Sequence, residues 1–215
     1  MLIACRSSRR LSVRPNLDVK RTQNLYMSAK SSNSGICALC GQRATKTKMI
    51  AHLAACAAAH DETGSPQPLV VLRFGQVGEP RYWLIIEAKA DAPLRNVDKL
   101  LRQLWLECCG HMSAFRVGRR ELAMTTAIAS AFAGAVGKLD YEYDFGSTTA
   151  LIGELVGKRH GSIGRAFVRL LARNEPLVWP CGDCKAPATV VCPYCIDSDD
   201  GFFCVAHADV HVHAG

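Results

Sequence analysis

The sequence predicts an α+β protein with a central mixed α/β domain, a small N-terminal zinc finger and a C-terminal Cys/His-rich zinc module. Between residues 67 and 175, apolar runs typical of strands alternate with segments of helical periodicity. Cysteine pairs with metal-ligand spacing lie on both sides of that stretch. A chain of 215 residues can bury one sizeable core, and small appendages then need metal ions to fold.

Two β-rich runs open the central domain. They are LVVLRF at 69–74 and YWLIIEA at 82–88, and the Gly- and Pro-containing segment between them predicts a β-hairpin. The turn-forming TGSPQP at 63–68 separates this hairpin from the finger, which we expect at 36–62.

A helix is expected over residues 91–110. Asp91 can cap its start, Gly110 can end it, and apolar side chains recur between them at helical spacing. A short strand at 115–117 and a second helix of small residues around 120–136 should follow.

The tract LDYEYDF at 139–145 alternates acidic and aromatic residues. On a strand, Tyr141, Tyr143 and Phe145 would share one face, and the acidic residues the other. Further strands are expected at 149–157 and 166–173, which completes the domain.

The first cysteine cluster is CALCGQRATKTKMIAHLAAC. Cys37 and Cys40 form a CxxC knuckle, and His52 and Cys56 lie one turn apart on a helix that should begin near Thr45. A knuckle facing such a pair predicts a tetrahedral Cys3His zinc site. His60 lies on the same helix face and is the alternative to Cys56 as fourth ligand.

The terminal cluster contains four pairs of metal-ligand residues, which is what two tetrahedral ions require. We expect an interleaved arrangement, with the first and third pairs holding one ion and the second and fourth pairs the other. The alternatives are a single ion held by the first two pairs, or a redox role for a CxxC motif. With the finger, the interleaved arrangement predicts three Zn2+ ions. The pairs lie in residues 179–215 and are Cys181 with Cys184, Cys192 with Cys195, Cys204 with His207, and His211 with His213.

Positive charge is concentrated at the N-terminal end. The formal net charge is +7, yet residues 1–60 hold ten Lys or Arg and the single acid Asp18, a balance of +9. This favours DNA or RNA as a partner over a membrane, because no amphipathic apolar face accompanies the charge. Residues 1–35 are expected to form a basic, disordered leader, and a merely solvated tail is the alternative.

Sequence-specific DNA readout is not expected from the finger. The exposed face of its helix offers mainly alanine, which cannot read base edges. Arg43, Lys46 and Lys48, near the helix start, are instead suited to phosphate contacts that are insensitive to sequence.

Eleven cysteines without a secretory signal indicate reduced thiols and a cytoplasmic, reducing location. The opening MLIACRSSRR lacks the apolar core of a signal peptide. The longest uncharged run, at 122–137, has sixteen residues and several polar ones, too short and too polar to cross a bilayer.

Two tracts, LRQLWLECCGHMSAF and YEYDFGSTTALIGELV, resemble the plasmid Ri open-reading-frame-three-like family, also described as insertion-element passenger TnpR-like proteins. The resemblance is to the branch with a leading CxxC finger and a Cys-rich end, and it covers most of the chain beyond Gly35. It implies an α+β fold and an association with mobile elements, without a known reaction. Many members carry YDFGD followed by Trp and His, where this chain has Ser147, Thr149 and Leu151.

Three function classes follow. The first is a non-enzymatic zinc protein that contacts nucleic acid through its basic N-terminal part and protein partners through its core and C-terminal module. The second is a metal-dependent phosphodiesterase that uses Asp140, Glu142 and Asp144, since hard carboxylates suit magnesium. The third is a zinc-stabilised protein–protein adaptor. A nucleophilic role for Cys108 or Cys109 is less favoured, because Cys108 continues the apolar face of its helix.

Overall fold

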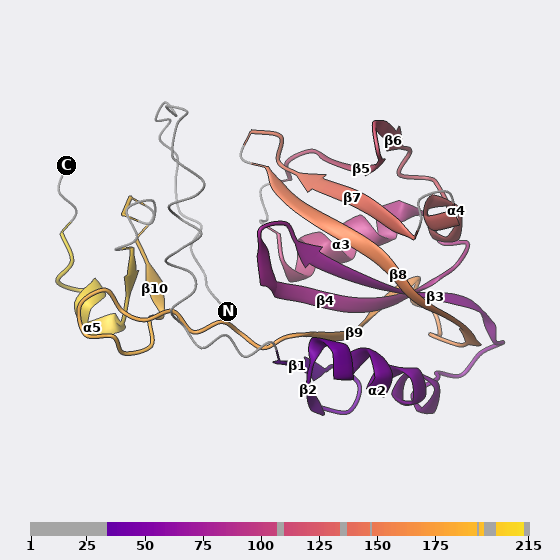
Figure 1. Cartoon of the computed structure of the whole chain (residues 1–215), viewed down its shortest axis with the longest axis horizontal. Coiled ribbons are helices and arrows are strands. Elements are labelled where there is room, and N and C mark those ends of the chain that lie inside the picture. The colour runs from indigo at the N-terminus through magenta and orange to yellow at the C-terminus, as the bar shows by residue number, and fades with distance from the viewer. Residues whose placement is uncertain are drawn as a thin grey trace. The chain divides into compact units, whose positions relative to one another are not determined.

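The computed structural model describes residues 34–106, 110–133, 137–146, 148–192, 194–195 and 201–212. These residues fall into two compact units, 34–175 and 176–212, which are treated separately below (Figure 1). Residues 1–33 of the expected leader lie outside the described residues, as do Cys108, Cys109 and His213.

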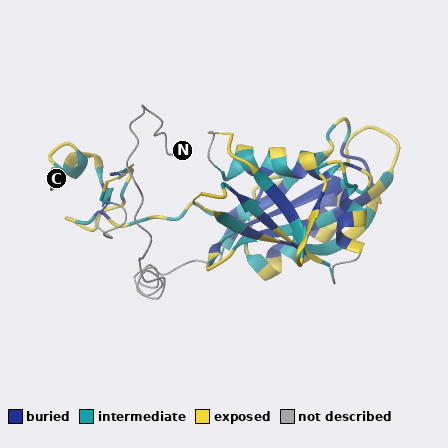
Figure 2. Cartoon of the chain, turned by 90° about the horizontal axis from the view of Figure 1, so that it is seen from above, coloured by how far each residue is buried: buried dark blue, intermediate teal, exposed yellow. Residues whose placement is uncertain are grey.

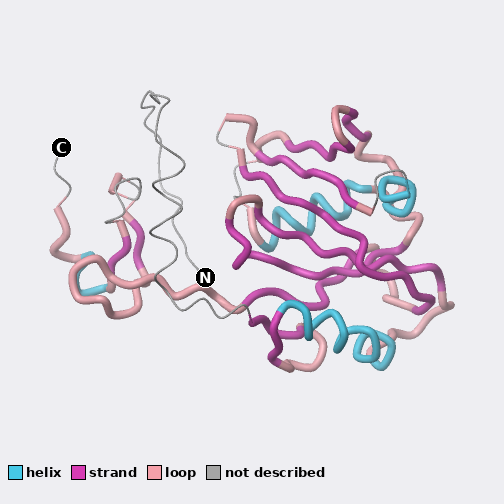
Figure 3. The backbone as a smooth tube through the Cα atoms, viewed as in Figure 1, coloured by secondary structure: helices cyan, strands magenta, loops and turns pink. Residues whose placement is uncertain are grey.

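The described part of the larger unit is built around one sheet of nine strands in the order β2-β1-β9-β4-β3-β8-β7-β5-β6. All neighbouring strands run antiparallel. Sheet dominates over helix in this unit (Figure 3). The strands are β1 (Ser34–Cys37), β2 (Arg43–Thr45), β3 (Gln67–Gln76), β4 (Glu79–Lys89), β5 (Ser113–Val117), β6 (Arg120–Leu122), β7 (Lys138–Tyr143), β8 (Thr149–Gly161) and β9 (Val168–Asn174).

Helices α3 (Leu94–Leu104) and α4 (Ile128–Ala133) pack on one face of the sheet. Successive strand residues point to opposite faces, so alternate apolar residues of β3, β4, β7 and β8 meet these helices. The largest core cluster results, and most of its strand residues are buried (Figure 2). It includes Leu72, Phe74, Leu84, Ile86, Leu94, Val97, Leu101, Phe115, Ile128, Phe132, Tyr141 and Tyr143.

Helix α2 (Lys46–Ala59) covers part of the opposite face. Trp83 and Ile85 of β4 alternate with the β4 residues of the first cluster and pack against α2. Because β1 pairs with both β2 and β9, the expected finger segment supplies two strands and a helix to the sheet unit. This second cluster consists of Cys37, Met49, Leu53, Cys56, Ala57, Trp83, Ile85, Leu171 and Ala172.

Beyond α2, the same face carries ion pairs that cross between strands. Glu154 of β8 contacts Arg73 of β3 and also Lys138 of β7, at 3.0 Å from the lysine nitrogen. Arg116 of β5 lies 2.6 Å from Glu142 of β7. Such a charged surface is typical of an antiparallel sheet with one solvated face.

The smaller unit has little regular structure. Its described elements are the paired strands β10 (Val190–Val191) and β11 (Phe202–Phe203) and the helical turn α5 (Val205–Ala208). The buried residues of its cluster are only Cys181, Cys192 and Phe203. A core of this size cannot hold such a segment in shape without a further constraint.

The hairpin prediction is confirmed, with strands longer than expected and a turn at Val77 and Gly78. The expectation for residues 120–136 is wrong in its first part, because residues 120–122 form β6 and pair with β5. Among the described residues of this stretch, helix is found only in α4, and residues 134–136 lie outside the described residues. We expected a disordered leader up to residue 35, but its last two residues, Ser34 and Gly35, belong to strand β1.

The start of α3 also differs from the expectation. Pro93 rather than Asp91 is the N-cap residue, and no side chain caps the helix. Instead, the backbone carbonyls of Thr126 and Met124 accept hydrogen bonds from the N–H groups of Leu94 and Arg95, both at 2.9 Å. Phe145 lies beyond the end of β7 and is exposed, so it does not share the buried face of Tyr141 and Tyr143.

Gly35 lies where the indole of Trp83 crosses β1. A Cβ at this position would overlap both Trp83 and the carbonyl oxygen of Arg173. We therefore expect Gly35→Ala to lower the free energy of unfolding by about 1–3 kcal/mol. Gly75→Ala in β3 is the control, because its Cβ would have 3.8 Å to the nearest atom. Urea unfolding followed by tryptophan fluorescence measures both, and equal effects would contradict the packing described here.

Candidate metal centres

The N-terminal centre combines a strand end with a helix. Cys37 ends β1, and Cys40 lies in the turn that follows, where the N–H of Gly41 donates to the carbonyl of Cys37 at 2.9 Å. Gly41 adopts φ +77°, which a glycine reaches without strain. His52 and Cys56 project from α2, so the structure brings the four expected ligands of this centre together.

The ligand atoms of this centre have the spacing of a tetrahedral site. All four lie within 4.8 Å of one another. The sulfurs of Cys37 and Cys56 are 3.8 Å apart, and the sulfur of Cys40 is 3.3 Å from Nε2 of His52. Zinc–sulfur bonds of about 2.3 Å in a tetrahedron separate two sulfurs by about 3.8 Å. The centre can therefore hold a tetrahedral metal ion after only small adjustments.

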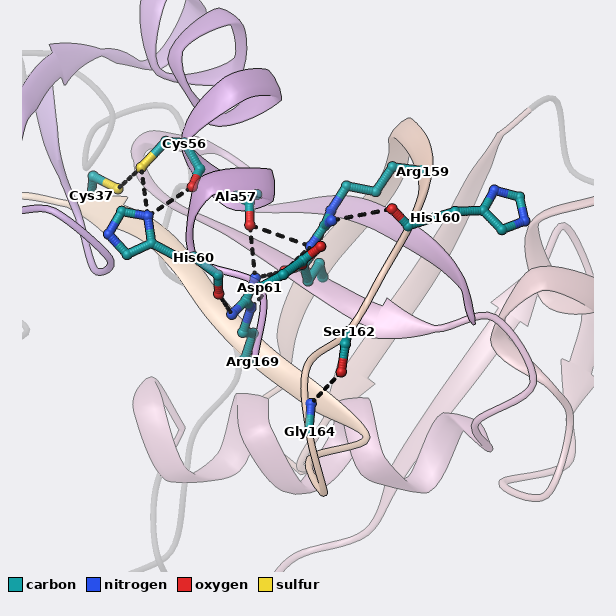
Figure 4. A network of polar contacts seen from close by, with 11 residues as sticks. Cys37, Cys56, Ala57, His60, Asp61, Arg159, His160, Ser162, Gly164 and Arg169 are labelled. Atoms are coloured by element: carbon teal, nitrogen blue, oxygen red, sulfur yellow. Dashed lines mark hydrogen bonds and ion pairs between the residues drawn. The ribbon is translucent and has the colours of Figure 1, made fainter. Parts of the chain in front are cut away.

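His60, the alternative ligand, lies outside this group. Its Nδ1 donates a hydrogen bond to the carbonyl oxygen of Cys56 at 2.8 Å and lies 3.7 Å from the Cys56 sulfur. The geometry thus places Cys56 among the ligands, and His60 next to it (Figure 4).

The C-terminal end of α2 is held by two arginines of the sheet (Figure 4). Arg169 donates to the carbonyl oxygens of His60 at 2.7 Å and Ala57 at 3.2 Å, and Arg159 donates to Asp61 at 2.8 Å. The bonds from Arg169 add donors to carbonyls at the end of the helix, where Ala57 also accepts from the N–H of His60 at 3.3 Å, and the positive charge is favourable at the negative end of the helix dipole.

Both arginines also bind Glu87, whose side chain is fully buried. Arg159 reaches its carboxylate at 2.8 Å and Arg169 at 2.5 Å. Burial alone would lower the pKa of Arg159, but its hydrogen bonds to Glu87 and Asp61 raise it, so the guanidinium stays charged. Glu87 lies within an apolar strand run, and sequence analysis did not single it out.

The smaller unit contains a second four-ligand group. It joins the first and third sequence pairs, Cys181 with Cys184 and Cys204 with His207. The sulfurs of Cys184 and Cys204 are 3.8 Å apart, and Nδ1 of His207 lies 3.4 Å from Cys181 and 3.3 Å from Cys204. These separations again match a tetrahedral site.

A third group joins residues from the second and fourth pairs. It contains Cys192, Cys195 and His211, and Nε2 of His211 lies 3.3 Å from the sulfur of Cys195. The expected fourth ligand, His213, lies outside the described residues. The two groups therefore alternate along the chain, which is the interleaved pairing that the sequence analysis expected, rather than one ion held by the first two pairs.

The thiols titrate differently in the absence of a metal ion. The backbone N–H of Gln42 lowers the pKa of Cys40, whereas burial and the neighbouring thiols raise the pKa of Cys56 to about 12. Burial opposes ionisation of Cys181, but backbone N–H groups outweigh it and lower the pKa to about 6. Adjacent thiols cannot all ionise without a cation, so a bound metal ion would displace protons from the group.

The residues expected to contact phosphate lie around the start of α2. Arg43 is 3.2 Å from the carboxylate of Glu175, and Lys46 donates to the carbonyl of Pro80 at 3.2 Å. Burial and the charge of Arg73 lower the pKa of Lys46. Lys48 is exposed.

The carboxylates proposed for phosphodiester hydrolysis are not grouped among the described residues. Asp140 is exposed on β7, Glu142 is paired with Arg116, and Asp144 follows the strand with φ +57°. Oδ2 of Asp144 lies 3.6 Å from Nδ1 of His111. Because the guanidinium group of Arg116 already pairs with the carboxylate of Glu142, these three acidic residues do not favour a magnesium site.

No known family profile matches the chain, and no curated protein is similar to it. One solved structure with a similar chain path is that of a protein of unknown function from Methanosarcina mazei Go1. It is 14% identical in sequence, with a TM-score of 0.43, over 51% of this chain and 70% of that chain. At this level the likeness indicates neither a family nor a function. Within the described residues, no helix has both the length and the apolar character needed to cross a membrane.

The interleaved pairing predicts a specific pattern of metal loss. Cys184→Ser with Cys204→Ser changes two ligands of one group and should remove one of three ions, whereas Cys184→Ser with Cys192→Ser damages both C-terminal groups and should remove two. Elemental analysis of protein purified without added metal counts the ions and identifies them. The opposite pattern would indicate sequential pairing.

Glu87→Gln leaves two partly buried guanidinium groups without their shared carboxylate, although Arg159 keeps its ion pair with Asp61. We expect the free energy of unfolding to fall by about 2–3 kcal/mol, because the remaining positive charge is only partly compensated or hydrated. Glu121→Gln is the matched control, since the Glu121 side chain is 61% exposed and should change stability by less than about 0.5 kcal/mol. Chemical unfolding compares the two variants, and similar losses would refute a special role for the buried cluster.

Proposed function

We propose that this chain is a non-enzymatic zinc protein in which three Zn2+ ions are structural. The observation that carries the proposal is the donor set. Each of the two four-ligand groups consists of three cysteine side chains and one histidine side chain. Four protein ligands fill a tetrahedral ion and leave no open position for substrate, whereas catalytic zinc keeps one position free. Thiolate and imidazole also select zinc over hard cations such as Mg2+.

We further propose that the basic N-terminal part contacts DNA or RNA without sequence preference. Two features support this. The balance of +9 over residues 1–60 gives a strong attraction for phosphate. In addition, α2 begins at Lys46, no side chain caps it and no acidic residue lies in its first turn, so the positive end of the helix dipole and the side chains of Lys46 and Lys48 make one electropositive end.

A protein partner is the second candidate function, and the C-terminal module favours it. Six large apolar side chains of its described residues are exposed, and they are available to supply the apolar part of a protein-binding surface. They are Val178, Val190, Tyr194, Val205, Val210 and Val212. On this proposal the zinc ions hold the module in shape, and the apolar surface docks the partner.

Membership of the plasmid Ri open-reading-frame-three-like family, with its mobile-element association, remains part of the proposal. The two resembling tracts supply neighbouring strands of the sheet, where Ser113 of β5 pairs with Tyr143 of β7. This pairing supports reading the tracts together as one structural motif.

The nucleic-acid proposal predicts steep salt dependence. Binding of a fluorescently labelled duplex to the full-length, metal-loaded chain should weaken linearly in a plot of log affinity against log salt. Lys46→Ser with Lys48→Ser should reduce the slope by about 2, because two phosphate contacts are lost. Arg119→Ser with Arg120→Ser removes the same charge from the opposite edge of the sheet and should leave the slope unchanged. Fluorescence anisotropy measures the affinities, and an absence of binding at low salt would eliminate the proposal.

A further inference from the structure

Each four-ligand group presents one thiol to solvent. In the smaller unit this thiol belongs to Cys184, which is exposed, whereas Cys204 is half-buried and Cys181 is buried. In the larger unit the exposed thiol belongs to Cys40. A bound metal ion keeps its cysteine ligands deprotonated, and an exposed thiolate is the form that a soluble oxidant attacks. Cys184 is therefore the point at which an oxidant can reach the C-terminal module.

A second thiol lies within reach of Cys184. The sulfur of Cys204 is 3.8 Å away and belongs to the same ligand group. Cys184 lies in a turn and Cys204 lies just before α5, so neither residue is inside a strand or a helix. A disulfide requires the two sulfurs to be about 2.05 Å apart, and a small movement of the turn brings them to that distance.

The apolar cluster of the module consists largely of its metal ligands. Four of its six described members are cysteines of the two C-terminal ligand groups. In a segment of this kind, the free energy of metal binding is the free energy of folding. Loss of the ions therefore removes the core of the module together with its cross-links. The six members are Cys181, Cys192, Cys195, Phe203, Cys204 and Ala208.

Helix α2, which carries two ligands of the N-terminal centre, is held in another way. Seven of the nine buried members of its cluster are not metal ligands, and they include Met49, Leu53 and Trp83. Arg169 also donates hydrogen bonds to carbonyl groups at the end of the helix. Oxidation of Cys40 thus leaves α2 packed on the sheet.

We propose that the C-terminal module is a redox switch that hydrogen peroxide opens through Cys184, a regulation that rests on the proposed structural role of zinc. The sulfur of Cys184 attacks one peroxide oxygen, the O–O bond breaks, and hydroxide leaves, which makes Cys184 a sulfenic acid. The thiolate of Cys204 then attacks this sulfur and expels a second hydroxide, and the disulfide forms. Each sulfur has given one electron, and peroxide has accepted both.

The disulfide takes two of the four ligands from its group. Cys181 and His207 alone cannot hold a tetrahedral ion, so zinc is released and the module loses its shape, while the larger unit keeps its fold. The apolar surface proposed to dock a protein partner is lost with the module. The disulfide keeps Cys184 and Cys204 together, so its reduction by a thiol restores this ligand pair.

The first test treats the full-length, metal-loaded chain with equimolar hydrogen peroxide. In two-dimensional NMR spectra, amides of the smaller unit should lose their dispersion, while those of α2 and the sheet keep it. A chromogenic chelator should detect the released ions, and dithiothreitol with added Zn2+ should restore the spectrum. A module that stays folded, or equal loss of structure in both units, would contradict the proposal.

The second test identifies the sulfurs. Peptide mapping without reduction should find a bridge between Cys184 and Cys204. Cys204→His keeps a nitrogen ligand but removes the second thiol, so the sulfenic acid at Cys184 should persist and be trapped by dimedone. Cys5→Ser is the matched control, because Cys5 belongs to none of the expected ligand pairs, and it should behave as the unaltered chain does.

A bridge that excludes Cys184, or a Cys204→His chain without a dimedone adduct at Cys184, would overturn the proposal. Elemental analysis before the addition of peroxide separates the two levels of inference. A chain that lacks its three ions refutes the structural role of zinc, whereas a chain that holds them and resists peroxide refutes the switch alone.

Discussion

The carboxylate of Glu87 is enclosed in the middle of a central strand, where an unpaired charge would be very unfavourable. Arg159 and Arg169 surround it from the strands on either side of the β3–β4 hairpin, and both extend to the end of α2. Because α2 carries His52 and Cys56, half of the ligands of the N-terminal centre depend on this charge cluster. The sheet, the helix and the metal centre therefore stabilise one another.

Local patterns in the sequence were sufficient to predict the central strands and the Cys/His groups that could hold metal ions. β-Rich runs bounded by Gly and Pro predict the β3–β4 hairpin, because such signals arise within a few residues. The ligands of the N-terminal group follow a CxxC spacing and a one-turn helical spacing, and these also act locally. The interleaved grouping was an expectation based on pair counting, and the geometry of Cys181, Cys204 and His207 agrees with it.

Contacts between distant segments could not be predicted in this way. β1 finds its neighbour β9 about two-thirds of the chain away, where the hydroxyl of Ser34 donates to Glu175 across 141 residues. The start of α3 is set by carbonyl groups of a later loop, so the capping residue in the sequence was misleading. Glu87 appeared as one polar residue in an apolar run, and its role is visible only once Arg159 and Arg169 are beside it.

The alternation of the two C-terminal ligand groups has a consequence for how the module assembles. A bridge between Cys184 and Cys204 closes a loop across 20 residues, and this loop contains Cys192 and Cys195. Once it is closed, part of the chain entropy that His211 loses on approaching Cys195 has already been lost, which favours that approach by about 0.5 kcal/mol or less because this entropy grows only slowly with loop length. If both groups hold metal as proposed, the first ion to enter favours the second, and molecules that hold a single ion should be somewhat fewer than two independent groups would give.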